Sequence, residues 1–147
     1  DPRLAGLPAV GFEPGGWTRV DAALGRSASD RKKMAVRADG RRAVTRFRLL
    51  ERFGPADRPV AALAECRLET GRTHQIRVHL AHIGHPLIGD PVYGRPRQTP
   101  AAAARFPRQA LHAATLGFRH PIDGRALRFE RPPPADLSAL LAALRDD

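Results

Sequence analysis

The stretch that decides the fold is "RLETGRTHQIRVHLAHIGHPLIGDPVYG", from Arg67 to Gly94. It contains three arginines and four histidines between repeated Gly and Pro residues. An ordinary core segment has little use for that mixture of side chains. Three interpretations are open: the histidines bind a metal, the arginines face an anion, or the segment shapes an active site.

A helix is predicted in the middle of this stretch. Ile76, Leu80 and Ile83 follow one another at i, i+4 and i+7, the spacing of one helical face. Thr73 has the chemistry of an N-cap, and Gly84 suits the left-handed position that follows many helix ends. We therefore expect about three helical turns from Thr73 to Gly84. The residues "HPLIGDPVYG" that follow should form an irregular loop.

A β-hairpin is predicted upstream of the helix. Residues 43–53 alternate between apolar and arginine-rich positions, which indicates a half-buried strand. The turn "GPADRP" leads to residues 60–69, which alternate again and are the expected antiparallel partner. The residues expected on the buried side of the first strand are Ala43, Thr45, Phe47 and Leu49.

Downstream, residues 110–118 and 126–130 are predicted strands, and "ADLSALLAALR" is a predicted amphipathic helix. The order β-β-α-β-β-α predicts an α+β domain with a mainly antiparallel sheet and flanking helices. We expect residues 1–17 to be a loop or a truncated edge and residues 18–147 to form the domain. The leucines that share one stripe of the last helix are Leu137, Leu140, Leu141 and Leu144.

The charge balance favours an anionic macromolecule as partner. The chain has 25 basic and 15 acidic residues and a net charge of +10. A GC-rich genome would explain why arginine outnumbers lysine, but not why acidic residues fail to keep pace. We therefore expect contact with nucleic acid. No apolar run reaches the roughly 18 residues of a membrane span, and the lone Cys66 and the absence of a secretion signal predict a cytoplasmic protein.

The metal interpretation is the weaker one. His79 and His82 would share a helical face, but His85 follows the predicted end of the helix. The stretch has neither a Cys pair nor an HExxH motif, and Asp90 is its only carboxylate beyond the helix. We therefore expect no metal site.

The anion interpretation rests on the start of the helix. Free N–H groups at a helix N-terminus favour anions. Arg72 precedes the predicted start, and Arg77 lies one turn into the helix, from where its planar guanidinium could reach a carboxylate or phosphate. The segment therefore has the features of an anion-facing helix start.

The same stretch resembles the signature of RNA pseudouridine synthases of the RluA/RluD type. That signature reads L-x-T-G-R-T-H-Q-I-R-V-H-L-A-x-x-G-H-P-(L/I)-x-G-D-x-x-Y-G, and the match here is long and nearly gapless. The segments "ALGRSASDRKKMAVRADGRRAVTRFRLLERF" and "RQALHAATLGFRHPIDGRALRFERPPP" resemble the family's flanking regions in the right order. The resemblance covers about residues 18 to 145 and is closer to the RluD branch than to the tRNA-modifying branch. It implies the C-terminal half of the family's catalytic domain.

Members of this family isomerise a uridine in RNA to pseudouridine, without cofactor or metal. By the resemblance, Arg77 pairs with the catalytic aspartate. Asp90 belongs to the loop at the end of the signature and holds that loop in place. Leu111, or as second choice Ile76, would form the apolar wall for the flipped base. The residues that best fit an RNA-facing set are Arg31, Lys32, Lys33, Arg72, His74 and Gln75.

The family's catalytic aspartate lies in an H-R-L-D-x-x-T-S-G motif that does not occur in this chain. Its base-stacking tyrosine is not matched either, since the only tyrosine is Tyr93, within the signature itself. We therefore expect this chain to be active only together with the N-terminal half of the domain. The expected partners are that half and RNA, and the resemblance to the RluD branch implies RNA of the large ribosomal subunit. The alternative is a non-catalytic RNA-binding module with the same fold.

Overall fold

The computed structural model describes residues 7, 9–95, 99–119, 122 and 126–146. Its elements include two α-helices, α1 (Gln75–His82) and α2 (Ala135–Asp146), and a short 3-10 helix, η3 (Ala101–Ala103). The strands are β1 (Val10–Glu13), β2 (Trp17–Asp21), β3 (Leu24–Arg26), β4 (Met34–Val36), β5 (Val44–Phe53), β6 (Ala61–Leu68), β7 (Thr115–Arg119) and β8 (Ala126–Glu130).

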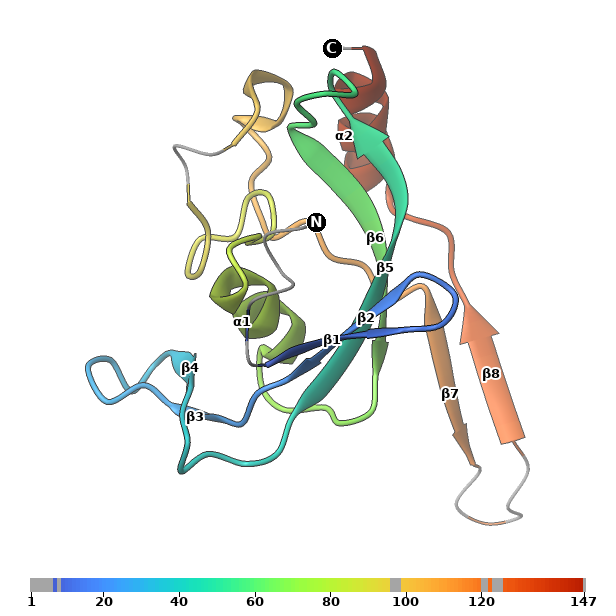
Figure 1. Cartoon of the computed structure of the whole chain (residues 1–147). Helices are drawn as coiled ribbons and strands as arrows, with labels where there is room; N and C mark the ends of the chain where they lie inside the picture. Colours follow the sequence, from blue (N-terminus) through green and yellow to red (C-terminus); the bar gives the residue numbers. More distant parts are fainter. Residues whose placement is uncertain (1–6, 8, 96–98, 120–121, 123–125, 147) are drawn as a thin grey trace.

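Every strand pair is antiparallel, as the sequence predicts. Four strands form one sheet in the order β1-β2-β5-β6, while β3–β4 and β7–β8 form separate two-stranded sheets. Figure 1 shows α1 beside the main sheet, with the β3–β4 and β7–β8 hairpins extending from opposite sides of the molecule. No described helix has the length and apolar character needed to cross a bilayer.

The predicted strands and the two predicted helices are present, although the strand expected at residues 110–118 begins only at Thr115, and four further strands were not predicted. β1, β2, β3 and β4 have only three to five residues each, too few to display a clear period of two. Part of the segment 1–17 is therefore regular structure, because Val10–Glu13 pairs with β2 at one edge of the main sheet. Residues 1–6 and 8 of that segment lie outside the described residues.

One residue of β5 does not lie where the alternation places it. Leu49 is expected on the buried side, but it is 43% exposed. The pairing with β6 shifts between Leu49 and Glu51, which marks a β-bulge. Phe47 before the bulge packs with the core beside α1, whereas Phe53 after it packs with α2. The bulge therefore lets one strand contribute to two cores.

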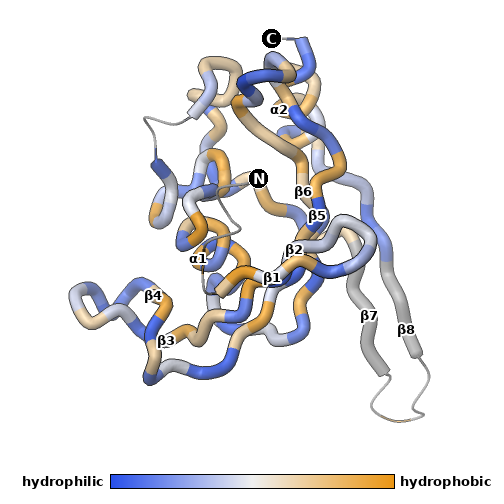
Figure 2. Tube along the Cα trace, viewed as in Figure 1, coloured by the Kyte–Doolittle hydropathy of each residue, from blue (hydrophilic) through white to orange (hydrophobic). Residues whose placement is uncertain are grey.

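The main core lies between α1 and the sheet. Val20, Phe47, Leu80 and Ile83 are its largest buried members. The second core is built on α2, whose four predicted stripe residues, from Leu137 to Leu144, are all buried. In Figure 2 the turn between β3 and β4 is mostly hydrophilic, in contrast to these apolar regions. The third cluster joins β3 and α1 through Leu24 and Val78.

The helix α1 is shorter than predicted and begins differently. It has eight residues, and its N-cap is His74, not Thr73. His74 has the left-handed backbone angle φ 55° and makes no side-chain cap hydrogen bond. The end is as predicted: Gly84 has φ 91°, and the N–H groups of Gly84 and His85 donate to the carbonyls of Ala81 and Leu80. This is the Schellman arrangement that favours glycine.

A buried polar network joins α1 to the sheet. Gln75 donates through Nε2 to the carbonyl of Val44 (2.9 Å) and to the hydroxyl of Thr45 (3.0 Å). Its Oε1 accepts from the Thr70 hydroxyl and from the backbone N–H of Arg72. His79, which is fully buried, contacts Thr45 Oγ1 at 2.7 Å and the Ala22 carbonyl at 2.8 Å.

The network assigns the proton of His79. The Ala22 carbonyl can only accept, so Nε2 carries the hydrogen and Nδ1 accepts from the Thr45 hydroxyl. Burial lowers the pKa of His79. The hydrogen bond to the Ala22 carbonyl raises it, but by less. His79 therefore stays neutral in the folded protein at pH values where an exposed histidine is protonated.

We predict that His79 lowers the free energy of unfolding as the pH falls. Above pH 6.5, its ordinary value, His79 is neutral in both states and the stability does not depend on it. Below that pH the unfolded state binds a proton and the folded state does not. The free energy of unfolding therefore falls, by at most about 1.4 kcal/mol per pH unit, until the lowered folded pKa is reached. Urea unfolding between pH 8 and pH 5 measures this slope.

His79→Gln should reduce this slope, because glutamine does not titrate, while His74, whose pKa burial also lowers, keeps its own smaller contribution. His82→Gln is the matched control, since His82 is an exposed histidine on the same helix, and its loss should leave most of the slope in place, because its charge is only a minor cause of the lowered pKa of His79. If the slope in His79→Gln is as steep as in the unaltered protein, another group is responsible for it.

Candidate functional site

The centre of the candidate site is a buried ion pair between Arg77 and Asp90. Arg77 lies on α1, and its Nε and Nη2 donate to the two carboxylate oxygens of Asp90 at 2.9 and 2.8 Å. The Asp90 side chain is fully buried, and the Arg77 side chain is 10% exposed. Two parallel charge-assisted hydrogen bonds fix the guanidinium in one orientation. The resemblance pairs Arg77 with a catalytic aspartate that this chain does not contain, and within this chain Arg77 has a different partner, Asp90.

Asp90 also orders its own loop. Its Oδ1 accepts hydrogen bonds from the backbone N–H groups of Val92 (2.9 Å) and Tyr93 (3.1 Å). Burial alone would raise the pKa of Asp90, but the hydrogen bonds from Arg77, Val92 and Tyr93 outweigh burial and hold the pKa below its usual value. The hydrogen bond to Asp90 in turn raises the pKa of Arg77. Asp90 is therefore a charged structural group that holds its loop, as the sequence predicts.

One edge of the Arg77 guanidinium is left over. Among the described residues, Nη1 has no hydrogen-bond partner, although all fully buried side-chain nitrogens and oxygens of that part of the chain have one. Nη1 therefore reaches the surface. Arg77 is thus a fixed cation with two donors committed to Asp90 and one edge presented outward.

The loop that carries Asp90 packs against the segment that carries Leu111. The loop after α1 carries Asp90, and in the same loop the carbonyl of Ile88 accepts from the N–H of Ala110 at 2.8 Å. A Cβ on Gly89 would lie 2.1 Å from the carbonyl oxygen of Arg108, so only glycine fits between the two segments. The segment that carries Leu111 is therefore held against the Asp90 loop.

The two residues predicted for the base pocket differ in their surroundings. Ile76 is half-buried and packs against the main core, the cluster that contains Val20 and Phe47. Leu111 is half-buried but belongs to none of the three core clusters. Its carbonyl accepts from Arg108 Nη1 at 3.2 Å, which fixes its backbone. Of the two, Leu111 has the apolar side chain that the core does not use.

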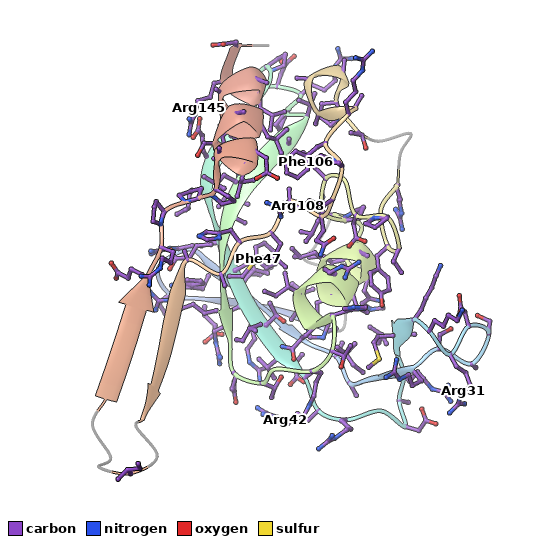
Figure 3. The ribbon with its side chains drawn as sticks, turned by 180° about the vertical axis from the view of Figure 1, so that it is seen from behind. Arg31, Arg42, Phe47, Phe106, Arg108 and Arg145 are labelled. Atoms are coloured by element: carbon purple, nitrogen blue, oxygen red, sulfur yellow. The ribbon has the colours of Figure 1, made fainter. Side chains whose placement is uncertain are left out.

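The predicted RNA-facing residues separate into two groups. Arg31, Lys32 and Lys33 are exposed in the turn between β3 and β4, and Figure 3 shows Arg31 at the end of the molecule opposite to Arg145 on α2. Arg72 and His74 are half-buried at the start of α1. This second group adjoins Arg77, whereas the first lies on a projecting hairpin.

Gln75 is a correction to the RNA-facing set. It is only 3% exposed, and both ends of its amide are engaged by Thr70, Arg72, Val44 and Thr45. A polar side chain so engaged holds the helix to the sheet and has no donor or acceptor at the surface for RNA. Its position in a polar motif suggested exposure, but the left-handed start of the helix turns it inward.

The described residues contain no group of three or more His, Cys, Asp or Glu side chains that could hold a metal ion. Cys66 is no candidate nucleophile either. Burial, followed by the neighbouring charge of Glu65, raises the pKa of its thiol to about 11. It therefore stays protonated at neutral pH.

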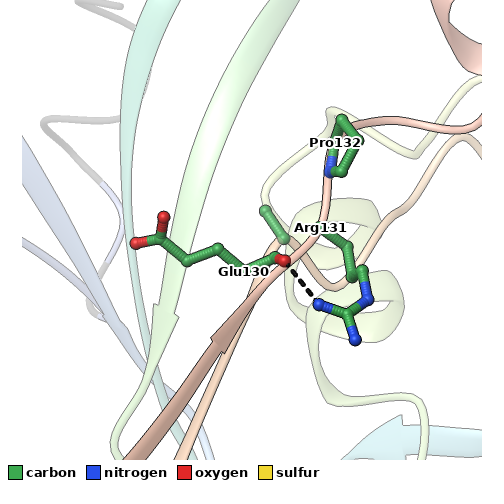
Figure 4. Close-up of a pocket in the computed structure, with 4 residues that line it drawn as sticks. Glu130, Arg131 and Pro132 are labelled. Carbon is green, nitrogen blue, oxygen red and sulfur yellow. Dashed lines mark hydrogen bonds between the residues drawn. The ribbon is translucent and has the colours of Figure 1, made fainter.

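An open hollow at the base of the β7–β8 hairpin is drawn in Figure 4. Ala114, Glu130, Arg131 and Pro132 line it, and Arg131 donates to the carbonyl of Glu130 at 2.8 Å. None of these residues belongs to the predicted site. The chemistry that the structure brings together is therefore that around Arg77.

Asp90→Asn is predicted to destabilise the fold strongly. The change leaves the buried guanidinium of Arg77 without its counter-charge, which typically costs about 3 to 5 kcal/mol. Asp136→Asn is the matched control, because Asp136 forms the same bidentate pair with Arg108 in an exposed position and its loss should matter far less. Urea unfolding of both variants measures the difference. Equal losses in the two variants would contradict a special role for the buried pair.

Known proteins resemble this chain in both sequence and fold. A family profile described as RNA pseudouridylate synthase matches residues 17–82. The chain is 53% identical over 136 residues to ribosomal large subunit pseudouridine synthase D of Xanthomonas campestris pv. campestris, which covers 87% of this chain and 40% of that protein. It is 45% identical over 147 residues to the protein of that name from Escherichia coli (strain K12), covering 95% of this chain and 43% of that protein.

Among solved structures, human RNA pseudouridylate synthase domain containing 1 superposes with a TM-score of 0.69 at 28% identity, over 92% of this chain and 55% of that one. The chain spans about two-fifths of the length of the two bacterial relatives. The profile match, the bacterial relatives and the shared fold agree with one another and with the signature around Arg77. The chain belongs to the RNA pseudouridylate synthase family, in its RluD-type branch.

Proposed function

We propose that the protein carrying this chain isomerises uridine to pseudouridine in RNA, and that this chain supplies the fixed cation of the active site. The reaction detaches the uracil base from its ribose and rejoins it through carbon. The two bacterial relatives are named for the large ribosomal subunit. We therefore propose large-subunit ribosomal RNA as the substrate and the cytoplasm as the place of reaction.

The observation that carries this proposal is the outward Nη1 edge of Arg77. Asp90 occupies Nε and Nη2 and holds the guanidinium still, and this leaves one edge to meet a second carboxylate. A fixed guanidinium lowers the pKa of a neighbouring carboxyl group and orients it. A catalytic aspartate at this edge would thus stay ionised and in position.

Asp90 itself does not fit the role of the catalytic aspartate. Its side chain is fully buried, and its oxygens accept hydrogen bonds from Arg77, Val92 and Tyr93. A nucleophile or base must reach the substrate. We therefore assign the catalytic aspartate to a part of the protein outside these 147 residues, and we assign the apolar wall of the base pocket to Leu111.

The alternative function, a non-catalytic RNA-binding module, explains less of the structure. Such a module needs exposed cations, and the β3–β4 turn has them. A binding module has no need for an arginine such as Arg77, which is buried, forms two hydrogen bonds with Asp90 and is exposed only along one edge. The isomerase therefore accounts for both the basic hairpin and the Arg77 site.

Arg77→Lys in the full-length protein is predicted to lower the rate of isomerisation by several orders of magnitude while RNA affinity changes little. Lysine keeps the charge but lacks the planar fork that meets two carboxylates at once. Single-turnover release of tritium from 5-tritiated uridine in ribosomal RNA measures the rate, and filter binding measures the affinity.

The matched control is Arg145→Lys, which alters an exposed bidentate pair between Arg145 on α2 and Glu51 on β5. It should leave both the rate and the affinity unchanged. A rate within a few-fold of the unaltered protein in Arg77→Lys would remove Arg77 from the active site.

Replacing Arg31, Lys32 and Lys33 by Gln is predicted to weaken RNA binding without lowering the single-turnover rate at saturating RNA. Each lost phosphate contact should reduce the slope of log affinity against log salt by about 0.7 on single strands or about 0.9 on duplex. The control removes three exposed arginines from the α2 end, at Arg52, Arg58 and Arg105. Equal salt slopes for the two triple variants would show that the effect comes from net charge and not from the hairpin.

A further inference from the structure

Tyr93 connects three parts of the site through one side chain. Its hydroxyl accepts a hydrogen bond from the backbone N–H of Met34 on β4 at 2.9 Å and lies 2.9 Å from Nδ1 of His74. Its ring lies under the guanidinium of Arg77, with 5.2 Å between Cζ and the ring centroid. Its backbone N–H donates to Asp90. Every one of these contacts leads to a residue of the site or to the basic hairpin.

The hydroxyl of Tyr93 also selects the tautomer of His74. The N–H of Met34 can only donate, so it uses a lone pair of the hydroxyl. The hydroxyl hydrogen is then free to donate to Nδ1 of His74, its other partner among the described residues. In this arrangement Nδ1 accepts and Nε2 carries the hydrogen. Burial, followed by the charge of Arg77, lowers the pKa of His74, so the ring is neutral at pH 7.5.

The backbone of His74 makes this contact more informative. His74 is the one described non-glycine residue with positive φ, at 55°. A side chain in this region typically costs about 1 to 2 kcal/mol, and surrounding contacts must hold it there. The rings of His74 and Tyr93 meet edge to face with centroids 5.6 Å apart, which adds to the hydrogen bond.

His74 also has a free edge, three residues before Arg77 in the chain. Nε2 of His74 has no partner among the described residues, and the side chain is half-buried at the start of α1. One turn further along α1, Arg77 presents Nη1 to the surface. Two donors in fixed orientation therefore face outward from the same end of the helix.

We propose that Tyr93 is a positioning residue for the isomerisation, which holds the Nε2–H tautomer of His74 and the guanidinium of Arg77 in the orientations that meet the substrate uridine and the catalytic carboxylate. The proposal rests on the function proposed above. It adds that the donor from His74 acts on an acceptor atom of the RNA at the reacting nucleotide. Through Met34, the same hydroxyl ties the basic hairpin to this end of α1.

The test is Tyr93→Phe in the full-length protein, which removes the hydroxyl and keeps the ring under Arg77. Loss of one such hydrogen bond should lower the single-turnover rate about tenfold, with RNA affinity within about twofold. Ser138→Ala is the matched control, because it removes an exposed hydroxyl from the outer side of α2. Its rate should equal that of the unaltered protein.

A readout that does not depend on turnover follows the tautomer directly. Long-range ¹H–¹⁵N correlation of the RNA-free protein at pH 7.5 should give His74 an Nε2–H pattern, and Tyr93→Phe should shift it to a mixture of tautomers. His74→Asn tests the route, since asparagine tolerates positive φ but has no imidazole. If Tyr93 acts through His74, adding Tyr93→Phe to His74→Asn should lower the rate by less than it does alone.

The outcomes separate clearly. An unchanged rate in Tyr93→Phe overturns the positioning role. A slower rate with an unchanged His74 tautomer also overturns it, because the slower rate would then come from a general loss of structure. If the unaltered protein forms no pseudouridine, the proposed function fails. The tautomer measurement would then still decide whether Tyr93 orients His74.

Discussion

The buried pair of Arg77 and Asp90 is the interaction on which the rest of the site depends. It joins α1 to the loop that follows, and that loop in turn holds the segment of Leu111 through Ile88 and Gly89. A buried charge pair stabilises little by itself, because desolvation offsets the attraction. Its effect is on orientation, because the two hydrogen bonds hold each side chain in one position relative to the other.

The polar network of Gln75, Thr45 and His79 does the same on the opposite side of α1. It satisfies buried groups of the sheet with side chains of the helix, so the helix can adopt one register only. Arg77 lies between this network and Asp90. Its placement therefore follows from two sets of contacts. In the motif Q-I-R, Gln75 bonds to the sheet, Ile76 packs against the core and Arg77 lies in the candidate site.

Much of the fold could be predicted from the sequence. The alternation in β5 and β6 and the leucine stripe of α2 are periodic patterns long enough to read, and Gly84 marks the end of α1. Leu49 could not be placed, because a bulge breaks the period of two without a signal in the residues. The start of α1 was misplaced for a related reason: a left-handed histidine is rarer as an N-cap than the threonine beside it.

The sequence by itself determined which segment carries the candidate site, since the signature from Arg67 to Gly94 contains Arg77, Asp90, His74 and Tyr93. Only the tertiary structure decided what each of them contacts. Gln75 and His74 are neighbours of equal polarity, yet one is buried and the other has a free edge. Such a difference depends on which way the chain enters the helix and on what packs across from it. Both are long-range properties, because Thr45, Asp90 and Tyr93 lie 13 or more residues away from their partners Gln75, Arg77 and His74.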